Sequence, residues 1–160
     1  MELVIGGIGA VSIINTVSKD IVMKTIQRSL SGTYKTIMWF SRYDQPYAQE
    51  IVSQIKKADL QFNVTLIDKL LQDLSTKKYN LESKAVLYAL ESVSTQLDVV
   101  HAELRDLQTA IEKHKNKYFN NWRCVSSNSS ISTLINNSII LNNRYQELLK
   151  LLNIVDAKIL

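Results

Sequence analysis

Glycine and proline are absent from residue 47 to residue 160, because the four glycines and the one proline all lie in the first 46 positions. At average usage, roughly a dozen of these residues would fall in a stretch of this length. Sheets with many tight turns need glycine where φ is positive, whereas long helices joined by links rich in serine and asparagine need neither residue. This distribution predicts an all-α protein.

Apolar periodicity supports the helical prediction, most strongly between Leu81 and Phe119. Apolar residues recur there at alternating spacings of four and three, as in the seam between packed helices. A helix over this range would be about 55 Å long, so only another long helix could cover its stripe. The seam consists of Val86, Leu90, Val93, Leu97, Val100, Leu104, Leu107 and Ile111, continued by His114 and Tyr118.

Three further segments carry stripes that need a partner helix. Residues 60–74 have two apolar faces, which indicates an element packed between neighbours. The alternation from Leu60 to Leu66 also permits a strand, although residues 67–71 break its two-residue period. The stripe of residues 60–74 is Leu60, Val64, Ile67, Leu71 and Leu74, with Phe62, Leu66 and Leu70 on the second face. The stripe of the first helix is Ile14, Val17, Ile21, Ile26, Leu30, Tyr34 and Ile37. The stripe of the last helix is Ile131, Leu134, Leu141, Tyr145, Leu148, Leu152, Val155 and Ile159.

Links between the helices are expected near residues 41–46, 76–82 and 120–130. Pro46 suits the first position of a helix, Ser130 suits an N-cap, and the first helix is expected to break near Gly32. The chain then forms one domain over residues 1–160, with residues 1–18 as an apolar, glycine-containing segment that can dock separately. An antiparallel bundle of four or five long helices with heptad-like packing would bury all of the stripes.

The opening stretch, MELVIGGIGAVSI, suits either a lipid interface or a partner surface. A dinucleotide-binding loop needs strands around its glycines, and the chain offers none, so we expect no cofactor. Residues 3–18 are uncharged but fall short of the ~20 residues that span hydrocarbon, which favours shallow insertion or packing on a protein. The residues named for either mode of docking are Val4, Ile5, Ile8, Val11, Ile14, Trp39 and Phe40.

A second candidate surface is the run KHKNKYFNNWR at residues 113–123. Basic side chains neutralise phosphates and aromatic faces stack on bases or sit at a lipid interface, so the mixture suits nucleic acid, anionic lipid or an acidic protein surface. The alternative is structural, because cations complement a helix C-terminus and aromatic residues can close the end of a bundle. The residues of this candidate site are Lys113, Lys115, Lys117, Tyr118, Phe119, Trp122 and Arg123.

Catalytic and metal-binding ingredients are scarce. Asp98 and His101 form one Asp-x-x-His pair, whereas a di-metal carboxylate site needs a second such pair, which the chain lacks. We therefore interpret both residues as solvated surface. His114 is interpreted as a semi-buried packing residue, and Cys124 as a partly buried, inert thiol. A single cysteine also suits a reducing, intracellular compartment. The net charge of +4 is mild for a dedicated nucleic-acid binder, so nucleic acid ranks below protein and membrane as a partner.

The order of these segments resembles that of small helical virion proteins, of the minor capsid type, from large double-stranded DNA viruses. The likeness consists of the glycine-rich apolar start, SRYDQPY at residues 41–47, and a long heptad helix ending in HKNKYFNNWR at residues 114–123. The resemblance implies a structural role inside a virus particle, as a clamp between capsid proteins or against an inner membrane. The chain is also distantly similar to helical pore-forming domains whose first helix inserts in membranes.

The sequence therefore favours a non-enzymatic protein that acts through helix-mediated contacts. Apolar residues surround the last helix on almost all sides, and a monomer rarely buries so many, so we expect self-association or a protein partner. The alternative hypothesis is a membrane-active bundle whose N-terminal helix inserts in lipid. The apolar residues of the last helix are Leu148, Leu149, Leu151, Leu152, Ile154, Val155, Ile159 and Leu160.

Overall fold

The structure is a computed structural model that describes residues 2–76, 83–117, 124–126 and 128–157; the side chains of residues 2–18, 156 and 157 are outside the description. The described chain is almost entirely helical and contains no strand, which confirms the all-α prediction. Its elements are α1 (Glu2–Arg42), the 3-10 helix η1 (Pro46–Ala48), α2 (Gln49–Lys57), α3 (Leu60–Thr76), α4 (Lys84–Lys115) and α5 (Asn128–Ala157).

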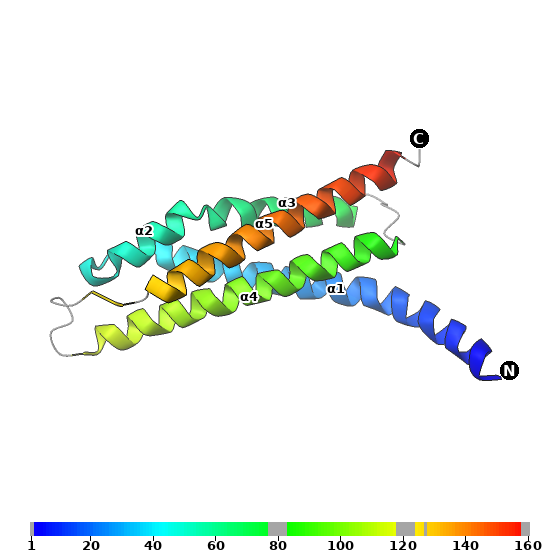
Figure 1. Cartoon of the computed structure of the whole chain (residues 1–160), viewed down its shortest axis with the longest axis horizontal. Coiled ribbons are helices and arrows are strands. Elements are labelled where there is room, and N and C mark those ends of the chain that lie inside the picture. The colour runs from blue at the N-terminus through cyan, green and yellow to red at the C-terminus, as the bar shows by residue number, and fades with distance from the viewer. Residues whose placement is uncertain (1, 77–82, 118–123, 127, 158–160) are drawn as a thin grey trace.

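The helices form a bundle in which α4 packs against α1 on one side and α5 on the other (Figure 1). α2 and α3 together cover the remaining side, between α1 and α5. The chain runs along the long axis in α1, returns through α2 and α3, runs forward again in α4 and returns in α5. This up-and-down path is the one that the antiparallel prediction requires. It buries most of the described stripe positions, but Ile21 and Tyr34 of the first stripe are 55% and 43% exposed, so their assignment to a buried stripe is wrong.

The neighbours α1 and α4, however, run parallel. The Ser29 hydroxyl of α1 donates a hydrogen bond to Asp98 of α4, and three residues further along both helices Gly32 lies against His101. The same order on both helices defines a parallel pair. α2 and α3 return the chain to its starting end before α4 begins, and α4 then lies beside α1 instead of beside α3.

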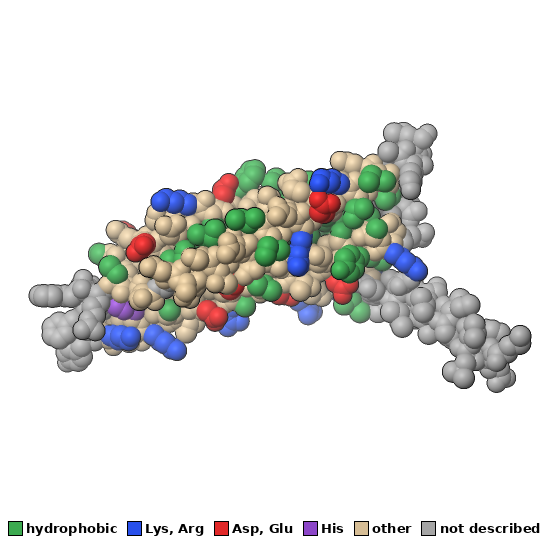
Figure 2. Space-filling view, viewed as in Figure 1, with side chains coloured by type: hydrophobic (Ala, Val, Ile, Leu, Met, Phe, Trp, Pro, Cys, Tyr) green, Lys and Arg blue, Asp and Glu red, His purple; other side chains and the backbone are tan. Residues whose placement is uncertain are grey.

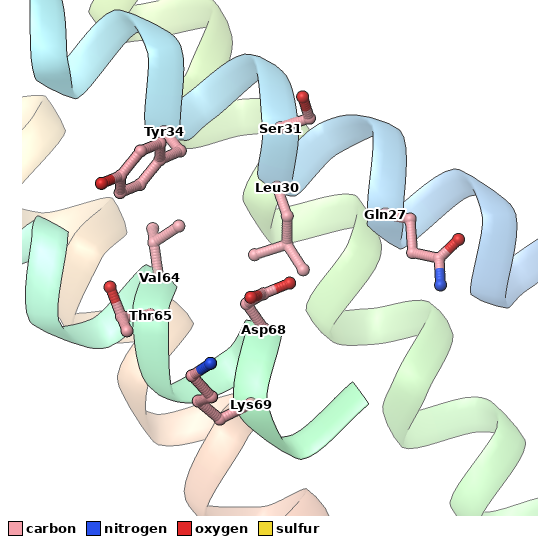
Figure 3. Close-up of a pocket in the computed structure, with 8 residues that line it drawn as sticks. All are labelled: Gln27, Leu30, Ser31, Tyr34, Val64, Thr65, Asp68 and Lys69. Atoms are coloured by element: carbon pink, nitrogen blue, oxygen red, sulfur yellow. The ribbon is translucent and has the colours of Figure 1, made fainter. Parts of the chain in front are cut away.

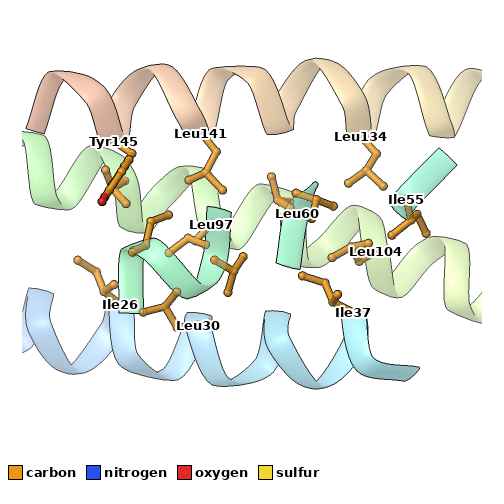
Figure 4. Close-up of a cluster of buried hydrophobic side chains, with 14 of the residues drawn as sticks. Ile26, Leu30, Ile37, Ile55, Leu60, Leu97, Leu104, Leu134, Leu141 and Tyr145 are labelled. Carbon is orange, nitrogen blue, oxygen red and sulfur yellow. The ribbon is translucent and has the colours of Figure 1, made fainter. Parts of the chain in front are cut away.

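One apolar core runs along the bundle, and the predicted seam of α4 lies at its centre (Figure 4). Every apolar residue of that seam from Val86 to Ile111 is at most 1% exposed. The largest fully buried side chains are Ile26, Phe40, Ile51, Leu60, Ile67, Leu90, Leu97, Leu104, Leu107, Ile111, Leu134 and Leu141. The core thus draws on every α-helix from α1 to α5.

The expected break near Gly32 is wrong, because α1 continues through this position. Gly32 has a packing role instead: a Cβ atom built there would lie 2.6 Å from Cε1 of His101. A residue without a side chain is therefore needed for the close approach of α1 and α4. The helix tolerates glycine because the tertiary contact outweighs its low helix propensity.

The structure has a break that the sequence interpretation missed, at Ala58 and Asp59 between α2 and α3. Asp59 adopts a φ of 53°, and its carbonyl accepts a hydrogen bond from the Asn63 amide. Aspartate visits this left-handed region more readily than most residues, which permits the turn without glycine. What looked like one continuous segment after Pro46 is therefore two helices.

Three further boundary predictions have clear outcomes. Pro46 begins η1, which leads directly into α2, so its assignment to the first helical position is confirmed. Ser130 is not an N-cap, because α5 already begins at Asn128. The alternative strand at residues 60–66 is wrong, because α3 begins at Leu60. On the second face of α3, Leu66 and Leu70 are half-buried while Phe62 is 56% exposed.

Candidate interaction surfaces

A row of aromatic rings connects the C-terminal end of α1 to that of α4. Trp39 stacks on Tyr43 with ring centroids 4.5 Å apart, and the hydroxyl oxygens of Tyr43 and Tyr47 are 2.7 Å apart. Tyr47 then lies 5.0 Å, between ring centroids, from His114 of α4. The parallel arrangement of α1 and α4 makes this row, because it places both C-termini at the same end of the bundle.

Tyr43 is held in its neutral form within this row. Burial is the main cause that raises its pKa to about 12, followed by the hydrogen bond with Tyr47 and the negative charge of Glu112. His114 is buried at 8% exposure and packs on Tyr47, which confirms its interpretation as a packing residue. The row therefore closes the end of the core.

The lysines of the predicted basic run lie beside this aromatic row. Lys113 and Lys115 belong to the last turn of α4, Lys117 follows it, and all three are exposed. Tyr118, Phe119, Trp122 and Arg123 lie outside the described residues. The structure thus brings two candidate surfaces, around Trp39 and around Lys113, to one end, although they are far apart in the sequence.

The residues named for membrane or partner docking fall into three groups. Val4, Ile5, Ile8, Val11 and Ile14 belong to α1, and their side chains lie outside the description. Trp39 is half-buried and lines a shallow hollow together with Lys35 and Arg42. Phe40 is a core residue with 1% exposure, so its assignment as a docking residue is wrong. Among the described residues, no helix is long and apolar enough to cross a membrane.

A groove of 320 Å³ lies between α1 and α3 and was not singled out in the sequence (Figure 3). Leu30 and Val64 form its apolar floor, and Tyr34, at 43% exposure, closes one side. Its polar rim consists of Gln27, Ser31, Thr65, Asp68 and Lys69. No histidine or cysteine of the described residues lines it, and periodicity could not reveal it because it depends on how far apart the two helices pack.

Polar side chains also connect α4 and α5. Gln96 donates to the backbone and side-chain oxygens of Asn137, both at 3.0 Å, and Asn137 donates to Oε1 of Glu103 at 2.6 Å. Arg144, two turns beyond Asn137 on α5, donates to the carbonyl of Ser92 at 3.0 Å, one turn before Gln96 on α4. These bonds set the register of the antiparallel α4–α5 pair.

Asp98 is exposed, as interpreted above, whereas His101 is half-buried, and both take part in the contact between α1 and α4. Asp98 accepts the hydrogen bond from buried Ser29, and the half-buried His101 ring contacts Gly32. Burial, and then the charge of Arg105, lower the pKa of His101 against the opposing effect of Asp98. In the described ranges no three His, Cys, Asp or Glu side chains come together as metal ligands. Cys124 is exposed, contrary to the expectation of a partly buried thiol.

The outer face of α5 exposes apolar side chains, while its inner face belongs to the core. Ile139 is 54% exposed, Ile140 is 40% exposed and Ile154 is 53% exposed. Leu149, Leu151 and Val155 are only half-buried against the core. Figure 2 shows hydrophobic side chains spread over the face that α5 presents in this view. We call Ile139, Ile140 and Ile154 the α5 apolar face; on the same side of the helix, exposed Asn143, Gln146, Glu147 and Lys150 lie between Ile140 and Ile154.

No family model and no solved structure matches the chain. Over 84 residues, the chain is 29% identical to an uncharacterized protein of Acanthamoeba polyphaga mimivirus. The aligned part is 52% of this chain and 41% of the relative, so the chain spans less than half the length of that curated protein. The similarity is consistent with a relationship to a viral protein.

Proposed function

We propose that this chain is a non-enzymatic structural protein that acts through helix-mediated contacts, first of all with further copies of itself. The observation that carries the proposal is the α5 apolar face, where Ile139 and Ile154 each keep more than half of their surface in solvent. Removing apolar surface from water is the main driving force of protein association. Exposed apolar residues along one helix favour a contact surface of this kind.

The finer proposal is a place in a virus particle, as a minor capsid or scaffold component. Its support is the resemblance of segment order described above, together with the sequence similarity to the mimivirus protein. A helical bundle with an apolar outer face suits such a role because it can fill a gap between larger proteins. Quantitative mass spectrometry of purified particles of the encoding virus should find the chain in a constant ratio to the major capsid protein. Its absence from particles would overturn the finer proposal alone.

Light scattering over a range of protein concentrations tests the contact itself. The intact chain should give a mass above that of the monomer, and the double variant Ile139→Gln, Ile154→Gln should return it to the monomer. The matched control is Thr95→Gln, Thr109→Gln, which changes two exposed polar residues of α4 instead and should associate like the parent. A strictly monomeric parent chain, or equal loss of association in the control, would contradict the proposal.

A further inference from the structure

The outer face of α1 carries an uninterrupted line of positive charge. From Ile21 to Tyr43 the chain has no aspartate or glutamate, and its four bases are Lys24, Arg28, Lys35 and Arg42. Their spacings of four and seven residues place them on one side of a helix. All four are exposed, whereas Ile26, Thr33 and Phe40 on the opposite side are buried. We call these four bases the α1 cationic stripe.

The stripe is free to meet an anionic partner. None of its four side chains forms a hydrogen bond or an ion pair with another described residue, and the ion pair found in the described chain, Lys150 with Glu147, lies on α5. At 1.5 Å per residue, the stripe extends over about 27 Å along α1. It is thus a straight edge of the molecule, without compensating charge within it.

Apolar and aromatic side chains flank this stripe on both sides. Ile21 is 55% exposed and Tyr34 is 43% exposed, while Met38 and Trp39 are half-buried. Near the C-terminal end of α1, Tyr34, Met38 and Trp39 line a shallow hollow of 520 Å³ together with Lys35, Arg42 and Tyr43. Exposed apolar side chains beside cations are the composition of a helix that lies in a membrane interface.

We propose that α1 lies flat on an anionic membrane surface through the α1 cationic stripe, with its apolar flanks dipping among the lipid headgroups. This site is separate from the α5 apolar face. Duplex nucleic acid would satisfy the four cations but would leave Ile21 and Met38 without a partner. Single strands need open aromatic faces for stacking, and Tyr43 already covers one face of Trp39. The flanking residues therefore favour lipid over nucleic acid.

Co-sedimentation with vesicles tests this assignment in the full-length chain. Vesicles of phosphatidylcholine with phosphatidylserine should bind the protein at low salt and release it at high salt, and vesicles of phosphatidylcholine alone should bind it weakly. Each cation near an anionic surface contributes about fivefold to partitioning. The double variant Lys35→Gln, Arg42→Gln should therefore bind about 25-fold more weakly, and circular dichroism should show an unchanged fold because both residues are exposed.

The matched control is Lys56→Gln, Lys57→Gln, which removes the same charge from two exposed lysines in the last turn of α2. It should retain most of the binding; equal loss in both double variants would overturn the proposal in favour of non-specific charge. In a Trp122→Phe background, Trp39 is the only tryptophan, and its fluorescence should shift to the blue on vesicles. No shift, or binding of duplex DNA through Lys35 and Arg42 without binding of vesicles, would also overturn it.

Discussion

Glu103 places a carboxylate oxygen in a buried position at the contact between α4 and α5. Its Oε1 accepts the hydrogen bond from Asn137, while Oε2 is buried and has no hydrogen-bond partner among the described residues. Burial, and then the negative charge of Asp106, raise the pKa of Glu103, although the bond from Asn137 acts in the opposite direction. The folded protein thus favours the protonated form of this residue more than the unfolded chain does.

The variant Glu103→Gln should therefore be more stable than the parent at neutral pH. A group whose folded pKa is raised stabilises the fold fully below its ordinary pKa of 4.5, and loses that contribution as the pH rises through the folded pKa. The amide removes the cost of the buried charge, so the gain should be present at neutral pH and vanish below pH 4.5. Urea unfolding across pH measures it, with exposed Glu91→Gln as the control. Destabilisation at neutral pH would contradict this assignment.

At the scale of the helix, the contact between α1 and α4 depends on Gly32, although glycine has a low helix propensity. Gly32 lies within continuous α1, and the His101 ring fills the space where its side chain would be. Beside it, buried Ser29 donates its hydroxyl hydrogen to Asp98. Helix propensity and packing therefore act in opposite directions at Gly32, and packing decides the geometry.

The substitution Gly32→Ala should destabilise the protein by about 1 kcal/mol, because overpacking against His101 exceeds the gain in helix propensity. In a His101→Ala background the clash is gone, so the same substitution should stabilise the protein by up to about 1 kcal/mol. A double-mutant cycle measured by urea unfolding separates the two effects. The same sign in both backgrounds would show that His101 does not limit this position.

At the scale of the whole molecule, the parallel pairing of α1 and α4 decides which surfaces lie together. It brings the ends of both helices to one end of the bundle, where the row from Trp39 to His114 closes the core next to Lys113. The apolar core of the described residues extends from Ile26 to Leu152. These buried side chains already form one continuous cluster that joins all the helices of the bundle.

Removal of residues 1–18 should leave a cooperatively folding bundle. The buried cluster from Ile26 to Leu152 already joins α1 to α5, so the thermal midpoint should change by less than about 4 °C. Circular dichroism during heating, for the intact chain and the shortened one, measures the change. A large loss of helicity or a broad, non-cooperative transition would show that the N-terminal segment packs into the core.

The amino-acid sequence alone determined the helices and their inner faces. The spacings from Val86 to Ile111 predicted the central seam, and stripe positions such as Val64 and Leu134 are buried as expected, whereas Ile21 and Tyr34 of the first stripe are exposed. This success has a local cause, because a stripe of apolar residues repeats with the period of the helix that carries it. The turn at Asp59 escaped this logic, because it depends on one residue with a φ of 53° and neither glycine nor proline marks it.

Only the tertiary structure decided which helices became neighbours, and with them the candidate surfaces. Phe40 and Trp39 look alike as aromatic residues at the end of α1, yet one is in the core and the other beside exposed cations. The sequence alone shows that the run from Ile21 to Tyr43 contains no acidic residue. That its basic side chains lie on an outer face follows only from the structure, in which α3 and α4 cover other faces of α1. An apolar stripe on one helix can pack against the stripe of any other helix. The pairing of helices therefore depends on the links between them and on single contacts such as that of Gly32 with His101.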